Sequence, residues 1–116
     1  QKTIQVLYLV HDILIQYISV SLRTMEDILK ESRLLHANIH RIHTTTMGAE
    51  RISRNLNLKN TDAVQFCINI ILNPECMVRR KGKNWYCEAD GVTITVNSSS
   101  CTVITAHRHH KKTSLQ

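Results

Sequence analysis

The residues of this chain that could do chemistry gather in its last third. His107 stands near the end of a stretch in which apolar and polar residues alternate, and Thr105 precedes it by two positions. Histidine suits proton transfer near neutral pH, because its unperturbed pKa is about 6.5. Hydroxyl groups can donate hydrogen bonds to charge that develops on phosphorus. The catalytic candidates, with His43 second to His107, are therefore His107, His43, Thr105 and Tyr86.

Basic residues accompany these candidates and suit a polyanion. Metal-free RNA cleavage needs a general base, a general acid and cations that offset the charge on the phosphate. The segment from Arg79 to Lys83 has four basic residues in five positions. Its plain alternative is a charged turn that guards a sheet edge, a common use of lysine. The candidates for binding nucleic acid are Arg51, Arg79, Arg80, Lys81, Lys83 and Arg108.

Composition limits the compartment and the cofactors. The chain has 116 residues, a net charge of +6 and four widely spaced cysteines without a C-x-x-C pair. We interpret the cysteines as reduced core thiols in a cytoplasmic protein. Three histidines lie between His107 and Lys112, and we interpret them as a solvated tail rather than a zinc site. We expect no metal and no cofactor, and we expect RNA or another polyanion as the partner.

The amino-terminal part predicts a long amphipathic helix. From Thr3 to about Ile42, apolar residues recur at three- and four-residue steps, as one helix or as two broken near Ser21. Asp12 and Gln16 interrupt the apolar run short of a membrane span. We expect the stripe to pack on the sheet or on a second copy, and we expect no membrane partner, since its polar face is not rich in Lys and Arg.

Two shorter helices are expected next. Three threonines at 44–46 suit a cap, and a helix then starts near Met47 with Ala49, Ile52 and Leu56 as its buried edge. A third helix, capped by Asn60 or Thr61, runs to about Leu72. Because this third helix is apolar almost all round, we expect it to be the most buried element.

Four strands should follow, at about 76–81, 84–89, 92–97 and 101–106. Asp90-Gly91 predicts a two-residue type I′ hairpin turn, which sets the pairing of the two middle strands. That register pairs Ala89 with Val92, Cys87 with Ile94 and Trp85 with Val96 on a core face. The other face then carries Tyr86 and Thr95 and is expected to be open.

The face taken by each residue of the last strand depends on the length of the serine loop. With Ser98 to Ser100 as a three-residue loop, the core face gains Thr102, Ile104 and Ala106. The open face then gains Val103, Thr105 and His107. A two-residue loop reverses this assignment. We prefer the three-residue loop, because it buries Ile104 and Ala106.

The predicted fold class is α+β, with amino-terminal helices packed on one face of a four-stranded antiparallel meander sheet. We expect a single domain over residues 1–116. Within it we distinguish an amphipathic helical segment at 1–34, a core at 35–108 and a basic tail at 109–116. The chain begins at Gln1, and Met25 is an alternative start.

Three segments carry a resemblance to known proteins: HTTTMGAERISRNLNL, RKGKNWY and ITVNSSSCTVITAHR. Over residues 35–108 the chain resembles a family of small bacterial proteins catalogued as a domain of unknown function. Its element order is distantly similar to the barnase, colicin and RelE-like ribonuclease toxins, which implies a small metal-independent RNA endonuclease. The alternatives are a non-catalytic nucleic-acid-binding module and an interaction or inhibitor module of phage or mobile-element origin. In the last case, the amino-terminal helix would serve as a homodimer or partner surface.

Overall fold

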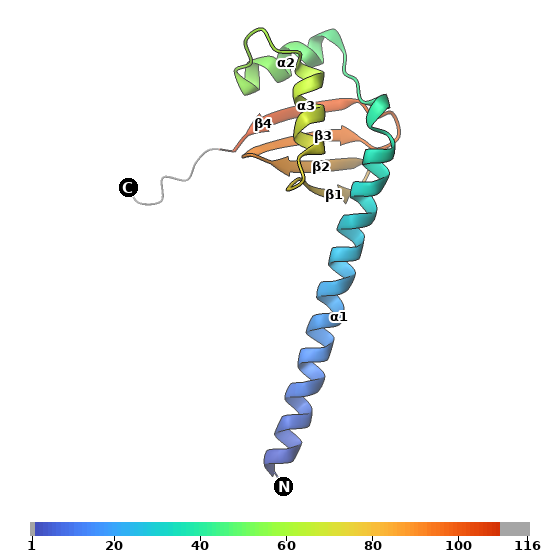
Figure 1. The fold of residues 1–116 in the computed structure, drawn as a ribbon, viewed down its shortest axis with the longest axis vertical. Helices are drawn as coiled ribbons and strands as arrows, with labels where there is room; N and C mark the ends of the chain where they lie inside the picture. Colours follow the sequence, from blue (N-terminus) through green and yellow to red (C-terminus); the bar gives the residue numbers. More distant parts are fainter. Residues whose placement is uncertain (1, 110–116) are drawn as a thin grey trace, which may run out of the picture.

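The computed structural model describes residues 2–109, so most of the predicted tail at 109–116 lies outside the described residues. Three α-helices and a short 3-10 helix precede a single antiparallel sheet with the strand order β1-β2-β3-β4. The helices lie on one face of this sheet (Figure 1). The predicted α+β meander is thus confirmed. The elements are α1 (Lys2–Ala37), the 3-10 helix (Ile39–Arg41), α2 (Thr46–Leu56), α3 (Ala63–Leu72), β1 (Met77–Lys81), β2 (Asn84–Ala89), β3 (Val92–Asn97) and β4 (Val103–Arg108).

The central hairpin has the predicted register. Asp90 and Gly91 have φ angles of 52° and 71°, as a type I′ turn requires at both central residues. The core-face pairs of β2 and β3 are those expected from the sequence, and Tyr86 faces Thr95 on the opposite side. A two-residue loop leaves no freedom to slip by one position, which explains why the sequence was sufficient here.

The last strand differs from both loop lengths considered in the sequence. Val103 pairs with Val96 and is 1% exposed, whereas Ile104 is 40% exposed, so both residues lie opposite to their predicted faces. A β-bulge at Ile104 inserts one extra residue, after which Thr105 pairs with Thr95. Ala106 is therefore buried as predicted. The bulge changes the alternation within the strand, and neither regular loop could provide that change.

The most buried element is β3 and not α3, contrary to expectation. Five of the six residues of β3 are buried, compared with four of the ten in α3. A central strand has a neighbour on each side and helices over one face. On its other face, Thr93 and Thr95 are only 6% and 7% exposed, between the side chains of β2 and β4.

Local side-chain bonds fix where the two short helices begin. The Thr45 hydroxyl accepts a hydrogen bond from the Gly48 amide at 3.0 Å and caps α2. For α3 the cap is Asp62, whose carboxylate accepts from the Gln65 amide at 3.0 Å. The predicted caps Asn60 and Thr61 were therefore wrong. A carboxylate at this position also suits the positive end of the helix dipole.

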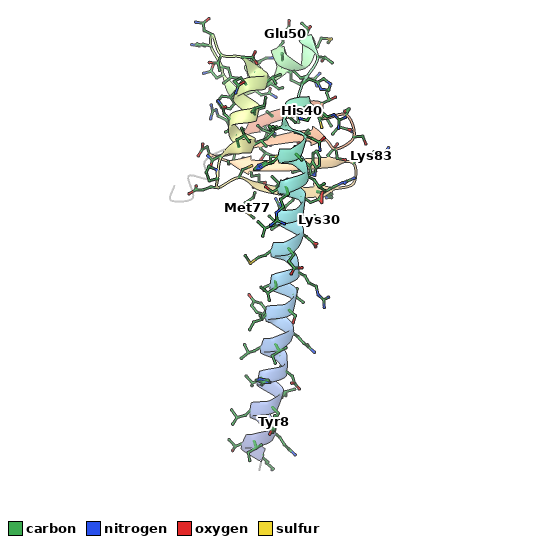
Figure 2. All side chains as sticks on the ribbon, turned by 45° about the vertical axis from the view of Figure 1, so that its right-hand side comes forward. Tyr8, Lys30, His40, Glu50, Met77 and Lys83 are labelled. Carbon is green, nitrogen blue, oxygen red and sulfur yellow. The ribbon has the colours of Figure 1, made fainter. Side chains whose placement is uncertain are left out.

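α1 is one unbroken helix, and only its carboxyl-terminal part contacts the sheet. Leu35 is its one buried residue among those described, and Glu31 accepts a hydrogen bond from the Trp85 indole at 3.1 Å. The rest of α1 extends past the β1 edge into the surroundings (Figures 1 and 2). The expected packing of the whole stripe on the sheet is wrong for a geometric reason. A helix of 36 residues is about 54 Å long. The strands of the sheet have only 5 or 6 residues and extend about 20 Å.

The four cysteines are all free thiols. Cys67, Cys87 and Cys101 are buried, and Cys76 is half-buried against the same core. Burial, with a smaller effect of the Asp62 charge, raises the pKa of Cys67 from 9.0 to about 12. A hydrogen bond with the Cys87 thiol lowers the pKa of Cys76, while the same contact and burial raise the pKa of Cys87. Cys67 and Cys87 therefore favour the neutral form in the folded chain.

The raised pKa of Cys67 predicts a loss of stability in alkali. Between pH 9 and about pH 12 the folded chain keeps a proton that the unfolded chain has released, so the free energy of unfolding falls as pH rises. One such thiol contributes a slope of about 1.4 kcal/mol per pH unit. Urea unfolding of the wild type and of Cys67→Ala at pH 8, 9, 10 and 11 measures this slope. A variant as pH-dependent as the wild type would contradict the prediction.

Gly48 predicts a change of stability with an unusual sign. A Cβ added there would lie 2.2 Å from the Thr44 hydroxyl oxygen, and that hydroxyl donates a hydrogen bond to the Val103 carbonyl at 3.0 Å. Gly to Ala normally stabilises a helix by about 1 kcal/mol. We expect Gly48→Ala to destabilise the protein by about 1 to 3 kcal/mol through overpacking. Arg51→Ala, exposed on the same helix, serves as the control in urea unfolding, and a more stable Gly48→Ala variant would refute the clash.

Candidate nucleic-acid interface

The face of the sheet opposite the helices, called the open face below, carries a row of polar side chains. Arg79 of β1 pairs with Tyr86 of β2, which pairs with Thr95 of β3, which pairs with Thr105 of β4. Direct cross-strand partners point to the same side of a sheet, so these four side chains form one line across it. At about 4.8 Å between strands, the line is about 14 Å long.

A second row on the open face brings in two histidines. His107 pairs with Thr93, which pairs with Glu88. The His107 and His109 rings are stacked, with centroids 6.0 Å apart and planes inclined by 22°. The His109 amide donates to the Gly91 carbonyl at 2.8 Å, and the His109 ring nitrogen contacts the Thr93 hydroxyl. His109 was missed because it was assigned to the tail, although the alternation of Thr105 and His107 continues through it.

At the β1 side, the open face is hollowed next to Tyr86. The hollow has a volume of about 620 Å³, and its lining includes Arg79, Lys81, Tyr86 and Glu88. Within it, an Arg79 guanidinium nitrogen lies 3.2 Å from a Glu88 carboxylate oxygen. The two side chains are 62% and 39% exposed, and exposed ion pairs contribute only about 0 to 1 kcal/mol. Glu88 thus orients Arg79 without preventing it from binding a stronger anion.

Three of the six predicted anion-binding residues lie on the helix-covered side of the sheet, although Arg80, on the edge strand, also lines the hollow. Arg80 pairs with Trp85 on the core face, and its guanidinium lies 3.9 Å from the Glu31 carboxylate. Arg108 pairs with Val92 and donates to the carbonyl of Leu56, the last residue of α2, at 3.3 and 3.4 Å. Arg51 is exposed on α2, which lies over the helix-covered face.

The remaining basic candidates border the open face. Lys81 ends β1 opposite Asn84 and is exposed. Lys83 lies in the turn between β1 and β2, at the edge of the sheet in Figure 2. Its backbone carbonyl accepts hydrogen bonds from the Ser98 amide and hydroxyl at 2.8 and 2.9 Å. These bonds connect the basic turn to the serine loop and hold its position.

His43 does not join the other catalytic candidates. Its Nδ1 donates to the Arg41 carbonyl at 2.8 Å, so its Nε2 is left to accept from the Thr102 hydroxyl at 3.2 Å. Thr102 precedes β4, and His107 lies five residues further along, or about 16 Å at about 3.3 Å per residue. A general acid and a general base must each come within about 3 Å of the reacting atoms. His43 and His107 therefore cannot act on the same phosphodiester in this arrangement.

Other parts of the described surface suit a polyanion less well. A hollow of about 700 Å³ lies where α2 and α3 begin, but its charged lining residues are Glu50 and Asp62. Among residues 2–109, no group of three His, Cys, Asp or Glu side chains is placed to hold a metal ion. The open face instead combines two cations, a phenol ring, two imidazoles and several hydroxyls. Such a set can contact both phosphates and bases.

Comparison with known proteins adds a family and no activity. The model of the family described as "Protein of unknown function (DUF3781)" matches residues 36–107, from the end of α1 to His107. Searches of the curated proteins and of the solved structures gave no match, so the distant likeness to ribonuclease toxins gains no support. The family match includes α2, α3 and nearly the whole sheet, which is more than half of the chain. The chain therefore belongs to the family "Protein of unknown function (DUF3781)".

Proposed function

We propose that the protein is an RNA-binding module that holds single-stranded RNA on the open face of its sheet. The observation that carries this proposal is the row of Arg79, Tyr86, Thr95 and Thr105, in which a cation, an aromatic ring and two hydroxyls are cross-strand neighbours. The guanidinium suits a phosphate, and the half-buried Thr105 hydroxyl suits a sugar or base edge, whereas Thr95, which is 7% exposed, lies beneath them.

The distribution of charge supports a polyanionic partner for the part of the chain that follows α1, called the sheet domain below. α1 contains four Lys and Arg residues and four Asp and Glu residues, so the net charge of +6 belongs entirely to the rest of the chain. On the open face, Arg79 and Lys81 are exposed, and Lys83 lies at its edge. Glu88 is the acidic member of the two rows described above, and it is already paired with Arg79. A basic surface of this kind attracts nucleic acid through long-range forces that salt screens.

A single strand suits this face better than a duplex. Tyr86 is half-buried beside the hollow, and the stacked histidines lie across the sheet from Glu88. In a duplex the bases are stacked on one another, whereas the unstacked bases of a single strand can lie against aromatic side chains. Such stacking contributes about 1 to 3 kcal/mol per base. Tyr86 is therefore the residue that we assign to base stacking.

RNA cleavage on the same face is the second candidate. Its supporting observation is that Tyr86, Thr105 and His107 share the open face, so a phosphate near Arg79 lies on the same side as the imidazoles of His107 and His109. We rank cleavage below binding because His43, the expected second proton-transfer group, is separated from His107, and a ring nitrogen of the neighbouring His109 is already engaged by the Thr93 hydroxyl.

Two matched double variants test RNA binding. Arg79→Ala with Lys81→Ala removes two cations from the open face, and Arg51→Ala with Arg54→Ala removes two exposed cations from α2. We expect the first pair to weaken binding of a fluorescent 15-nucleotide RNA at least tenfold, and the second less than threefold. The first pair should also reduce the slope of log K against log salt by about 1.4, since each phosphate contact contributes about 0.7. Fluorescence anisotropy at 50 to 300 mM salt measures both, and equal losses for the two pairs would refute this site.

A cleavage assay distinguishes the two candidate functions. We expect the wild type to bind total RNA in EDTA without strand scission. Scission by the wild type and by His43→Ala, but not by His107→Ala, would replace the binding proposal with an endonuclease centred on His107. Scission that survives in both variants would exclude both histidines as its source and indicate a contaminating nuclease.

A further inference from the structure

Among residues 2–109, most of the exposed large apolar side chains belong to α1, away from the open face. Its large apolar side chains from Ile4 to Leu29 are between 46% and 71% exposed, apart from Ile28, which is half-buried. An 18-residue window of this helix has a mean hydropathy of 1.3, and none of it is buried. Figure 2 shows the side chains of α1 projecting freely, with Tyr8 near the far end and Lys30 close to the sheet. Exposed apolar patches of this extent mark interaction sites.

A narrow polar stripe runs along this part of α1. It contains Gln5, Asp12, Gln16 and Ser19, at steps of seven, four and three residues, and Arg23 continues it. At about 100° per residue these positions fall within an arc of about 60°. The remaining circumference between Ile4 and Leu22 is apolar except for His11 and Ser21. The binding partner of α1 must therefore cover most of the helix circumference and leave one narrow side in water.

A second copy of the helix would cover too little of this surface. The best seam for helix pairing contains Ile15, Ile18 and Leu22, at the three- and four-residue steps of a coiled coil. Val6 and Val20 lie on the opposite side of α1 and are 57% and 60% exposed. Pairing through the seam would leave that opposite side in water, because a seam is narrower than the apolar arc present here.

A lipid bilayer surface matches both the wide apolar arc and the polar stripe. If α1 crossed a bilayer, Asp12 would lie near the centre of the apolar run, at a cost of about 2.5 to 3.5 kcal/mol. If it lies along the surface, the polar stripe faces water and the apolar arc enters the acyl region. We propose that α1 docks lengthwise on a lipid bilayer with this orientation. The expectation of no membrane partner rested on a polar face that is poor in Lys and Arg. Residues 4–22 do not pack on the sheet, and a docking driven by apolar area does not require such cations.

The charge of α1 indicates whether hydrophobic or electrostatic forces would bind it to the bilayer. Its acidic and basic residues are equal in number, so the docking is hydrophobic and does not depend on anionic lipid. The full chain should therefore float with vesicles of phosphatidylcholine alone, in 0.1 M and in 1 M NaCl alike. This condition separates α1 from the basic sheet domain, whose attraction to anions is weakened by salt.

Two variants with the same added charge test the orientation. Leu7→Lys with Ile18→Lys places two cations on the apolar arc, and Gln5→Lys with Gln16→Lys places two on the polar stripe, with the same eleven-residue spacing. We expect the stripe variant to float with the vesicles like the wild type, and the arc variant to fall more than tenfold in its bound fraction. Circular dichroism verifies that both variants keep their helix content.

Three outcomes would overturn the proposal. The first is a wild-type chain that does not bind the phosphatidylcholine vesicles. If light scattering shows that this chain is a dimer, a second copy covers α1 instead of lipid. Equal loss of flotation in both variants would place the polar stripe inside the bilayer and exclude the surface orientation. Loss of flotation at 1 M NaCl alone would assign the binding to charge. RNA affinity of the arc variant should equal that of the stripe variant, which carries the same added charge, and this keeps the two proposals separable.

Discussion

The two-residue turn at Asp90-Gly91 is the constraint on which the rest of the sheet domain depends. A β-strand alternates its side chains between two faces, so a shift by one position would exchange the core with the surface. With both turn residues at positive φ, the hairpin pairs Trp85 with Val96 under the helices. Tyr86 and Thr95 are then necessarily on the other side. One local geometry thereby decides which residues build the core and which can meet a partner.

The β-bulge at Ile104 extends this separation to the last strand. Val103 and Ala106 are both buried, although a regular strand would place residues three positions apart on opposite faces. Ile104 is the extra residue of the bulge and lies at the surface. Thr105 and His107 therefore still pair with Thr95 and Thr93. The bulge therefore satisfies the core at both ends of β4 while it keeps the polar rows intact. Bulges are frequent next to functional sites for this kind of reason.

The two surfaces that we assign to partners depend on different forces. The open face lies on the part of the chain that carries all of its net positive charge, and its contacts would weaken with salt. α1 as a whole has balanced charges, and the exposed apolar area of its amino-terminal part is driven from water whatever the salt concentration. α1 contacts the helix side of the sheet near β1 and then leads away from it, so its exposed part and the open face are separate surfaces. RNA and a membrane would not compete for the same residues.

Local sequence patterns predict the features that depend on near neighbours: three helices ahead of the sheet, the hairpin register and the polar row of Tyr86 and Thr95. The features that depend on distant partners are visible only in the folded chain. Arg80 and Arg108 look like free cations in the sequence, yet they bind Glu31 and the Leu56 carbonyl, which belong to helices far away in the sequence. His43 is fixed beside Thr102 by a parallel bridge between residues 59 apart, which removes it from His107. Periodicity shows that α1 has an apolar surface. The size of the sheet determines how much of that surface can pack against the sheet.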